Sequence, residues 1–160
     1  MGMARASGVL LALAGVGFVG AGMWARNEVR QALARERIVS TSDAEPPEAP
    51  VTTAAAARSM AEVIRGRTLS AAGDRTYAET ATYIDAEGNP TSDSESALKD
   101  ERTGQPVENP DHALWVQSTT LQTALMQAYL SARLAELTIA MGAALVAAGA
   151  GIVAAARASR

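Results

Sequence analysis

The chain has no cysteine and only one histidine, His112. The absence of cysteine excludes disulfides, thiolate metal sites and the lipid-attachment cysteine of a bacterial lipoprotein. A lone histidine has no partner with which to hold a metal or to activate a nucleophile. The sequence also lacks a glycine-rich phosphate loop, a paired-histidine metal motif and a nucleophile elbow. We therefore predict that the protein is not an enzyme and has no catalytic residues, no cofactor and no metal site.

Charge is missing from two stretches of twenty residues, 6–25 and 137–156. A helix of twenty residues spans about 30 Å, which is the thickness of the hydrocarbon core of a bilayer. These stretches are predicted to be transmembrane helices, flanked by an N-terminal tail at 1–5 and a C-terminal tail at 157–160. The first stretch is longer than a usual signal-peptide core, so we expect it to be retained.

Between the two stretches, residues 26–136 contain 11 basic and all 17 acidic residues. This excess of negative charge repels nucleic acid, so nucleic acid is not an expected partner. We predict that residues 26–136 form one small, loop-rich acidic domain outside the membrane.

Helix-forming patterns extend both charge-free stretches into this domain. The first helix is expected to continue through 26–37, which contain no glycine or proline. Asn109 and Pro110 are a favourable helix start, and no proline follows them, so a single helix is predicted from 110–136 onward through the second span. Thr53 is expected to cap a further helix that ends before Gly73. The predicted fold class is mainly α, a two-transmembrane-helix hairpin with long extramembrane extensions.

Small residues recur along both spans at helical spacing, and small seams allow close helix packing in lipid. The sequence leaves open whether the two seams face each other within one chain or face a neighbouring subunit. The residues on the first span are Gly8, Ala12, Gly15 and Gly22, and those on the second are Ala140, Ala144, Ala147, Gly151 and Ala154.

The helix extension from 113 to 132 carries no charge at all. Leu121, Leu125 and Ala128 share one of its faces, and a freely solvated helix normally has charges over its outer surface. We therefore expect this helix to be covered on more than one side, by its own chain or by another protein.

Four residues are predicted to lie at the membrane interface: Trp24, Arg26, Arg133 and Glu136. Tryptophan favours the headgroup region, and Arg133 and Glu136 are one helical turn apart, at a spacing that allows a local ion pair. Membrane lipid is therefore an expected partner.

Several segments resemble a family of small two-span actinobacterial membrane proteins. They are 34–43 (ARERIVSTSD), 73–79 (GDRTYAE), 83–110 and 115–133. The resemblance implies a hairpin with cytoplasmic termini and an extracytoplasmic loop, whereas the distribution of Lys and Arg leaves the orientation open. Family members often carry the label "aromatic ring-opening dioxygenase", but non-haem iron usually needs two histidines and a carboxylate, and this chain has one histidine.

The predicted function is that of a non-catalytic cell-membrane protein, an accessory or interaction subunit of a larger membrane assembly or a homo-oligomer. The alternative is an envelope protein that binds a divalent cation or another ligand through the loop carboxylates Asp85, Glu87 and Asp93.

Overall fold

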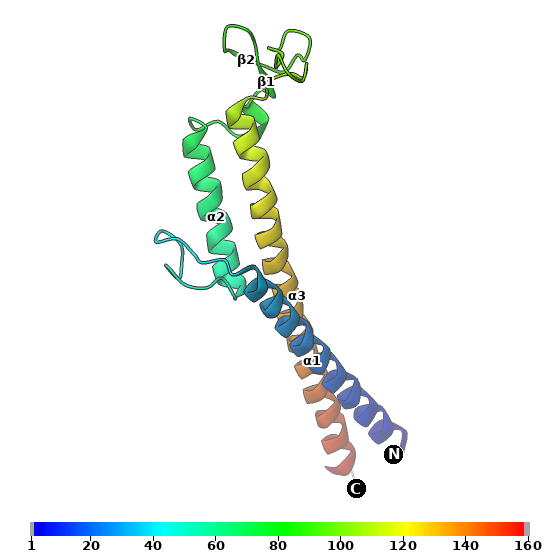
Figure 1. Ribbon diagram of the computed structural model, residues 1–160. Helices are drawn as coiled ribbons and strands as arrows, with labels where there is room; N and C mark the ends of the chain where they lie inside the picture. Colours follow the sequence, from blue (N-terminus) through cyan, green and yellow to red (C-terminus); the bar gives the residue numbers. More distant parts are fainter. Residues whose placement is uncertain (1, 159–160) are drawn as a thin grey trace. The chain divides into compact units, whose positions relative to one another are not determined.

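The computed structural model describes residues 2–158, and the tail residues Met1, Ser159 and Arg160 lie outside the described residues. The described chain is mainly helical, as predicted (Figure 1). Two of its helices are long and apolar enough to cross a membrane. The elements are α1 (Gly2–Glu36), α2 (Ala54–Ala71), the 3₁₀ turn η1 (Tyr77–Glu79), β1 (Tyr83–Ile84), β2 (Pro90–Thr91) and α3 (Pro110–Ala158).

The chain divides into two compact units. Unit 1 comprises Met1–Val39, Ala49–Ala57 and Gln127–Arg160, and unit 2 comprises Ser40–Glu48 and Arg58–Met126. Residues 26–37 and 127–136 thus cluster with the charge-free stretches, whereas the predicted division grouped them with the acidic segment.

In unit 1, α1 lies beside the C-terminal half of α3, and the two ends of the chain are at the same end of this pair (Figure 1). Gly8, Gly15 and Gly22 are buried and recur every seven residues, so they share one face of α1. A β-carbon added to Gly8 would lie 2.8 Å from the carbonyl oxygen of Gly149, and one added to Gly22 would lie 2.8 Å from that of Ala135. The two backbones therefore approach each other where side chains are absent.

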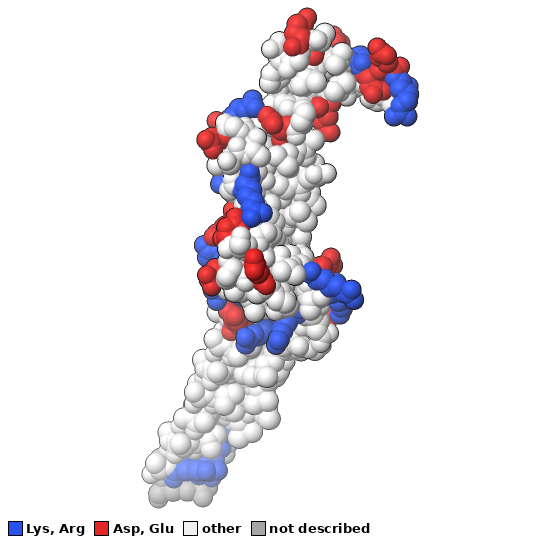
Figure 2. Space-filling view, turned by 60° about the vertical axis from the view of Figure 1, so that its left-hand side comes forward, with Lys and Arg blue, Asp and Glu red and all other residues white. Residues whose placement is uncertain are grey.

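Large apolar side chains of unit 1 point away from this contact. Leu10 and Leu13 of α1 are 67% and 62% exposed, and Leu137 and Met141 of α3 are 56% and 51% exposed. Figure 2 shows the paired helices as an uncharged surface between basic groups near each of its ends. Glycines thus lie between the two helices and leucines face outward. In a helix pair surrounded by water, large apolar side chains are instead buried between the helices.

The structure separates the two predicted small-residue seams. The α1 seam lies against α3, since Gly8, Gly15 and Gly22 are buried and Ala12 is beside Gly149. The α3 seam is on the wrong face for this contact, and all five of its residues are exposed: Ala140, Ala144, Ala147, Gly151 and Ala154. Ala135, Gly142 and Gly149 take its place. Glycine at 142 and 149 permits backbone contact that the β-carbons of the alanine seam would prevent.

Helix α2 begins and ends where the sequence predicts. The hydroxyl of Thr53 accepts a hydrogen bond from the Ala56 N–H at 3.2 Å, which caps the first turn. Gly73 has a φ of +64°, a left-handed conformation that suits glycine just after a helix end.

In unit 2, the start of α3 is held by side-chain hydrogen bonds. The side-chain oxygen Oδ1 of Asn109 accepts a hydrogen bond from the Asp111 N–H at 3.0 Å, and the side-chain nitrogen Nδ2 of Asn109 donates to the Ala81 carbonyl at 2.9 Å. Trp115 is 4% exposed and donates from Nε1 to the Arg75 carbonyl at 3.0 Å. These contacts tie α3 to the segment that follows α2.

The segment 76–109 contains the only two strands of the described residues, paired antiparallel with Tyr83 opposite Thr91. Single antiparallel β-bridges also pair Tyr83 with Glu108 and Lys99 with Pro106, so the later part of the segment folds back on its beginning and on itself. The Asp85 carboxylate accepts hydrogen bonds from the N–H groups of Glu87 and Asn89 and thereby fixes a tight turn.

The predicted face on the first half of α3 is only partly covered by the chain. Leu125 is 3% exposed and Ala128 is half-buried, but Leu121 is 55% exposed. The buried positions of this half are Trp115, Ser118, Leu125 and Ala132. The chain itself therefore leaves the face that contains Leu121 exposed, and the expectation that another protein covers this face stays a prediction.

Candidate functional site

A cavity of about 410 Å³ lies in unit 1 at the point where the charge-free parts of α1 and α3 end. Pockets that bind small molecules are typically about 300–1,000 Å³. Its lining comes from α1, from the residues that begin α2 and from α3: Met23, Arg26, Asn27, Val29, Arg30, Leu33, Thr52, Thr53, Ala54, Ala55, Ala132, Arg133 and Glu136.

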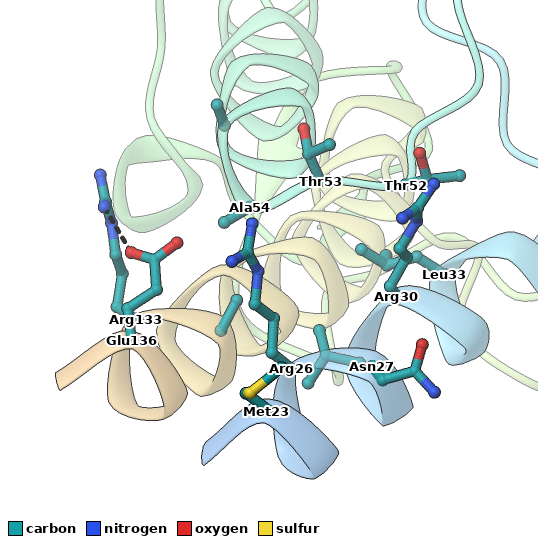
Figure 3. A pocket seen from close by; sticks show the side chains of 13 residues that line it. Met23, Arg26, Asn27, Arg30, Leu33, Thr52, Thr53, Ala54, Arg133 and Glu136 are labelled. Carbon is teal, nitrogen blue, oxygen red and sulfur yellow. Dashed lines mark hydrogen bonds and ion pairs between the residues drawn. The ribbon is translucent and has the colours of Figure 1, made fainter. Parts of the chain in front are cut away.

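Two arginines of α1 line this cavity one helical turn apart. Figure 3 shows Arg26 and Arg30 extending from α1 toward the segment that holds Thr52 and Ala54. Residues four apart lie on the same side of a helix, which explains why both guanidinium groups reach one cavity. Within the described residues 2–158, neither Arg26 nor Arg30 forms an ion pair.

The third arginine, Arg133, comes from α3. Its Nη1 lies 2.8 Å from a carboxylate oxygen of Glu136, and its guanidinium lies 5.4 Å from the ring centroid of Tyr129. A hydrogen bond with Tyr129 and the ion pair with Glu136 raise the pKa of Arg133 above its ordinary value. With three arginines and one glutamate, the lining has a net positive charge.

The N-terminus of α2 forms another part of the lining. Thr52, Thr53, Ala54 and Ala55 border the cavity, and the first turn of α2 contains no acidic residue. Unpaired N–H groups and the helix dipole place a partial positive charge at a helix N-terminus. This end of α2 therefore adds to the positive potential of the arginines.

Two of the predicted interfacial residues, Arg133 and Glu136, meet Arg26 at this cavity. Trp24 is 70% exposed and follows the lining residue Met23. Sequence reasoning did not single out Arg30 as a site residue, although its spacing of four from Arg26 would have identified it. It also missed the threonines before α2, because their proximity to α1 depends on the fold.

Two of the three loop carboxylates of the alternative hypothesis, Asp85 and Asp93, cap their own turns. Asp85 holds the N–H groups of Glu87 and Asn89, and Asp93 holds those of Glu95 and Ser96. A backbone hydrogen bond from Asn89 keeps the pKa of Asp85 below its usual value, and one from Glu95 does the same for Asp93. Over residues 2–158 the structure brings together no group of three His, Cys, Asp or Glu side chains that could hold a metal.

His112 is half-buried, and its ring lies 5.0 Å from that of Tyr77 at an angle of 31°. The contact is a tilted packing of two rings in the first turn of α3.

Comparisons of the chain with protein-family models, with curated proteins and with solved structures found no match.

Proposed function

We propose that this chain is a non-catalytic integral membrane protein whose charge-free helices form a two-span hairpin. The observation that supports the hairpin is the inverted packing of unit 1, in which buried glycines meet and leucines face outward. In lipid, apolar side chains can face the surroundings at no cost, and glycine seams bring helices together. The termini are then on one side of the membrane, which we assign to the cytoplasm on the family resemblance.

The extramembrane part is proposed to act by binding other membrane proteins or a second copy of this chain. The supporting observation is the exposed face of α3 in unit 2. It presents Leu114 and Leu121, which are seven residues apart on one side of the helix, at 36% and 55% exposure along a stretch with no charged residue. A contact with another protein would bury these side chains, as the cores of interfaces do.

Single cysteines test the membrane arrangement, because the natural chain has none. A membrane-impermeant maleimide should label Ser92→Cys from one side of the membrane and should fail to label Val16→Cys in intact membranes. Labelling of Ser92→Cys in intact cells would place the loop outside the cytoplasm. Equal labelling of both variants in intact membranes would contradict the hairpin.

Cross-linking and co-purification from native membranes test the binding role. A cysteine-directed cross-linker should join Leu121→Cys to another protein or to a second copy. The buried Leu125→Cys, four residues away, serves as the matched control and should give no adduct. Purification in mild detergent that yields only a monomer, with no adduct at Leu121→Cys, would contradict the role as an interaction subunit.

A further inference from the structure

We infer that the arginine-lined cavity of unit 1 binds the phosphate group of an anionic phospholipid. This inference rests on the proposed membrane placement and makes it specific, because it names the lipid chemistry and the residues that recognise it.

The first argument is charge. Arg26 and Arg30 line the cavity without an ion pair among residues 2–158, and Arg133 retains donors beyond the one that bonds Glu136 at 2.8 Å. Guanidinium groups bind phosphate oxygens in pairs and are enriched where phosphate is recognised. A ligand with negative charge would balance the net positive charge of this lining.

The second argument is the N-terminus of α2, which supplies donors of a different kind. Thr53 and Ala54 border the cavity at the point where the helix begins. Backbone N–H groups at a helix start bind phosphate readily, and no acidic side chain in the first turn of α2 competes for them. Arginines from one helix and the residues that begin another therefore line a single cavity.

The third argument is depth. Arg26 is the first charged residue after the stretch 6–25, and Glu136 is the last before the stretch 137–156. The cavity between them is thus at the boundary between apolar and charged surface, which is where the phosphates of one leaflet lie. Met23, which belongs to the charge-free stretch, adds an apolar side chain to the lining on the membrane side of Arg26.

The test uses full-length protein in phosphatidylcholine vesicles that contain a small fraction of phosphatidylglycerol with brominated acyl chains. Bromine quenches nearby tryptophan, and the exposed Trp24 is next to the cavity residue Met23, whereas Trp115 is 4% exposed. Vesicles with the same fraction of brominated phosphatidylcholine give the reference. We expect stronger quenching by phosphatidylglycerol at equal mole fraction.

Charge-matched variants separate a built site from general attraction to an anionic surface. Arg30→Gln should lower the preference for phosphatidylglycerol about tenfold, as expected when a charge-assisted hydrogen bond from a guanidinium to a phosphate is lost. Arg37→Gln removes the same charge from an exposed residue outside the cavity and should leave the preference unchanged. Equal effects of the two variants, or no preference in the natural protein, would overturn the inference. Circular dichroism checks that each variant is folded.

Inorganic phosphate in pure phosphatidylcholine vesicles provides the second arm. A rise in melting temperature with phosphate that depends on Arg30, without any preference for phosphatidylglycerol, would identify free phosphate as the ligand and overturn the lipid assignment. Flotation of the vesicles tests the membrane hairpin separately from the proposed lipid site. Protein that floats but shows no lipid preference contradicts this inference alone, and protein that does not float contradicts the membrane hairpin.

Discussion

Gly15 of α1 and Gly142 of α3 touch through their backbones, since a β-carbon added to either would lie 2.6 Å from the carbonyl oxygen of the other. The same reciprocal relation joins Gly8 to Gly149, seven residues away on each helix. The antiparallel pair is therefore in a single register along its length. The glycines allow a separation that any larger residue would increase.

Gly15→Ala should destabilise the helix pair by about 1–3 kcal/mol, the usual cost of forcing extra atoms into a packed contact. The obstructing atom is a backbone oxygen, so the helices must separate to admit the methyl group. Reversible unfolding in mixed detergent micelles measures the change. Gly17→Ala is the control, because an added β-carbon there meets nothing within 4 Å. Equal stability of the two variants would show that the helices do not pack through Gly15.

Asn109→Ala should cost unit 2 about 1–2 kcal/mol, because the cap of α3 is lost. Asn109 also donates to the Ala81 carbonyl at 2.9 Å, so Asn109→Asp should recover only the capping part of the loss. In thermal melting monitored by circular dichroism, we expect the melting temperature to be highest for the natural protein, lower for the Asp variant and lowest for the Ala variant. An Asp variant as stable as the natural protein would show that the bond to Ala81 contributes nothing.

Trp115→Phe should destabilise unit 2 by about 1–3 kcal/mol, since a buried hydrogen bond to the Arg75 carbonyl is removed. The matched control is Val116→Ala at the next position, which is 45% exposed and should change stability little. Thermal melting of both variants makes the comparison. A Trp115→Phe variant with the same melting temperature as the natural protein would contradict the structural role of this hydrogen bond.

Acid should loosen the turns of the acidic segment. Hydrogen bonds from backbone N–H groups lower the pKa of Asp85, Asp93 and Asp100 below the ordinary value of 3.8. A carboxylate with a lowered folded-state pKa contributes stability that is complete above the unfolded value and is lost as pH falls through the folded value. The loss is therefore expected below pH 3.8.

The amide resonance of Asn89 reports this titration directly, because its N–H donates to the Asp85 carboxylate at 2.7 Å. We expect its chemical shift to follow an acid–base transition with a midpoint below 3.8. Asp85→Asn should abolish the transition. A midpoint at or above 3.8 in the natural protein would contradict the hydrogen-bonded turn.

The sequence predicts the helices well because their causes are local. Thr53 caps α2, Asn109 caps α3, and both interactions are between residues two or three positions apart. Turn chemistry and capping depend on neighbours in the chain, so they are visible without tertiary contacts. The short strands of the acidic segment were less predictable, because Tyr83 pairs with both Thr91 and the distant Glu108.

The sequence by itself determined that two charge-free helices of membrane length enclose an acidic segment, because charge and helix period are properties of single stretches. Only the tertiary structure decided which small face of α3 meets α1. Gly142 and Gly149 face α1 in place of the alanine seam, since their contacts with Gly15 and Gly8 leave no room for a β-carbon on either helix. The tertiary structure also brought Arg26 and Arg30 to the start of α2, a proximity of residues more than twenty positions apart that no local pattern encodes.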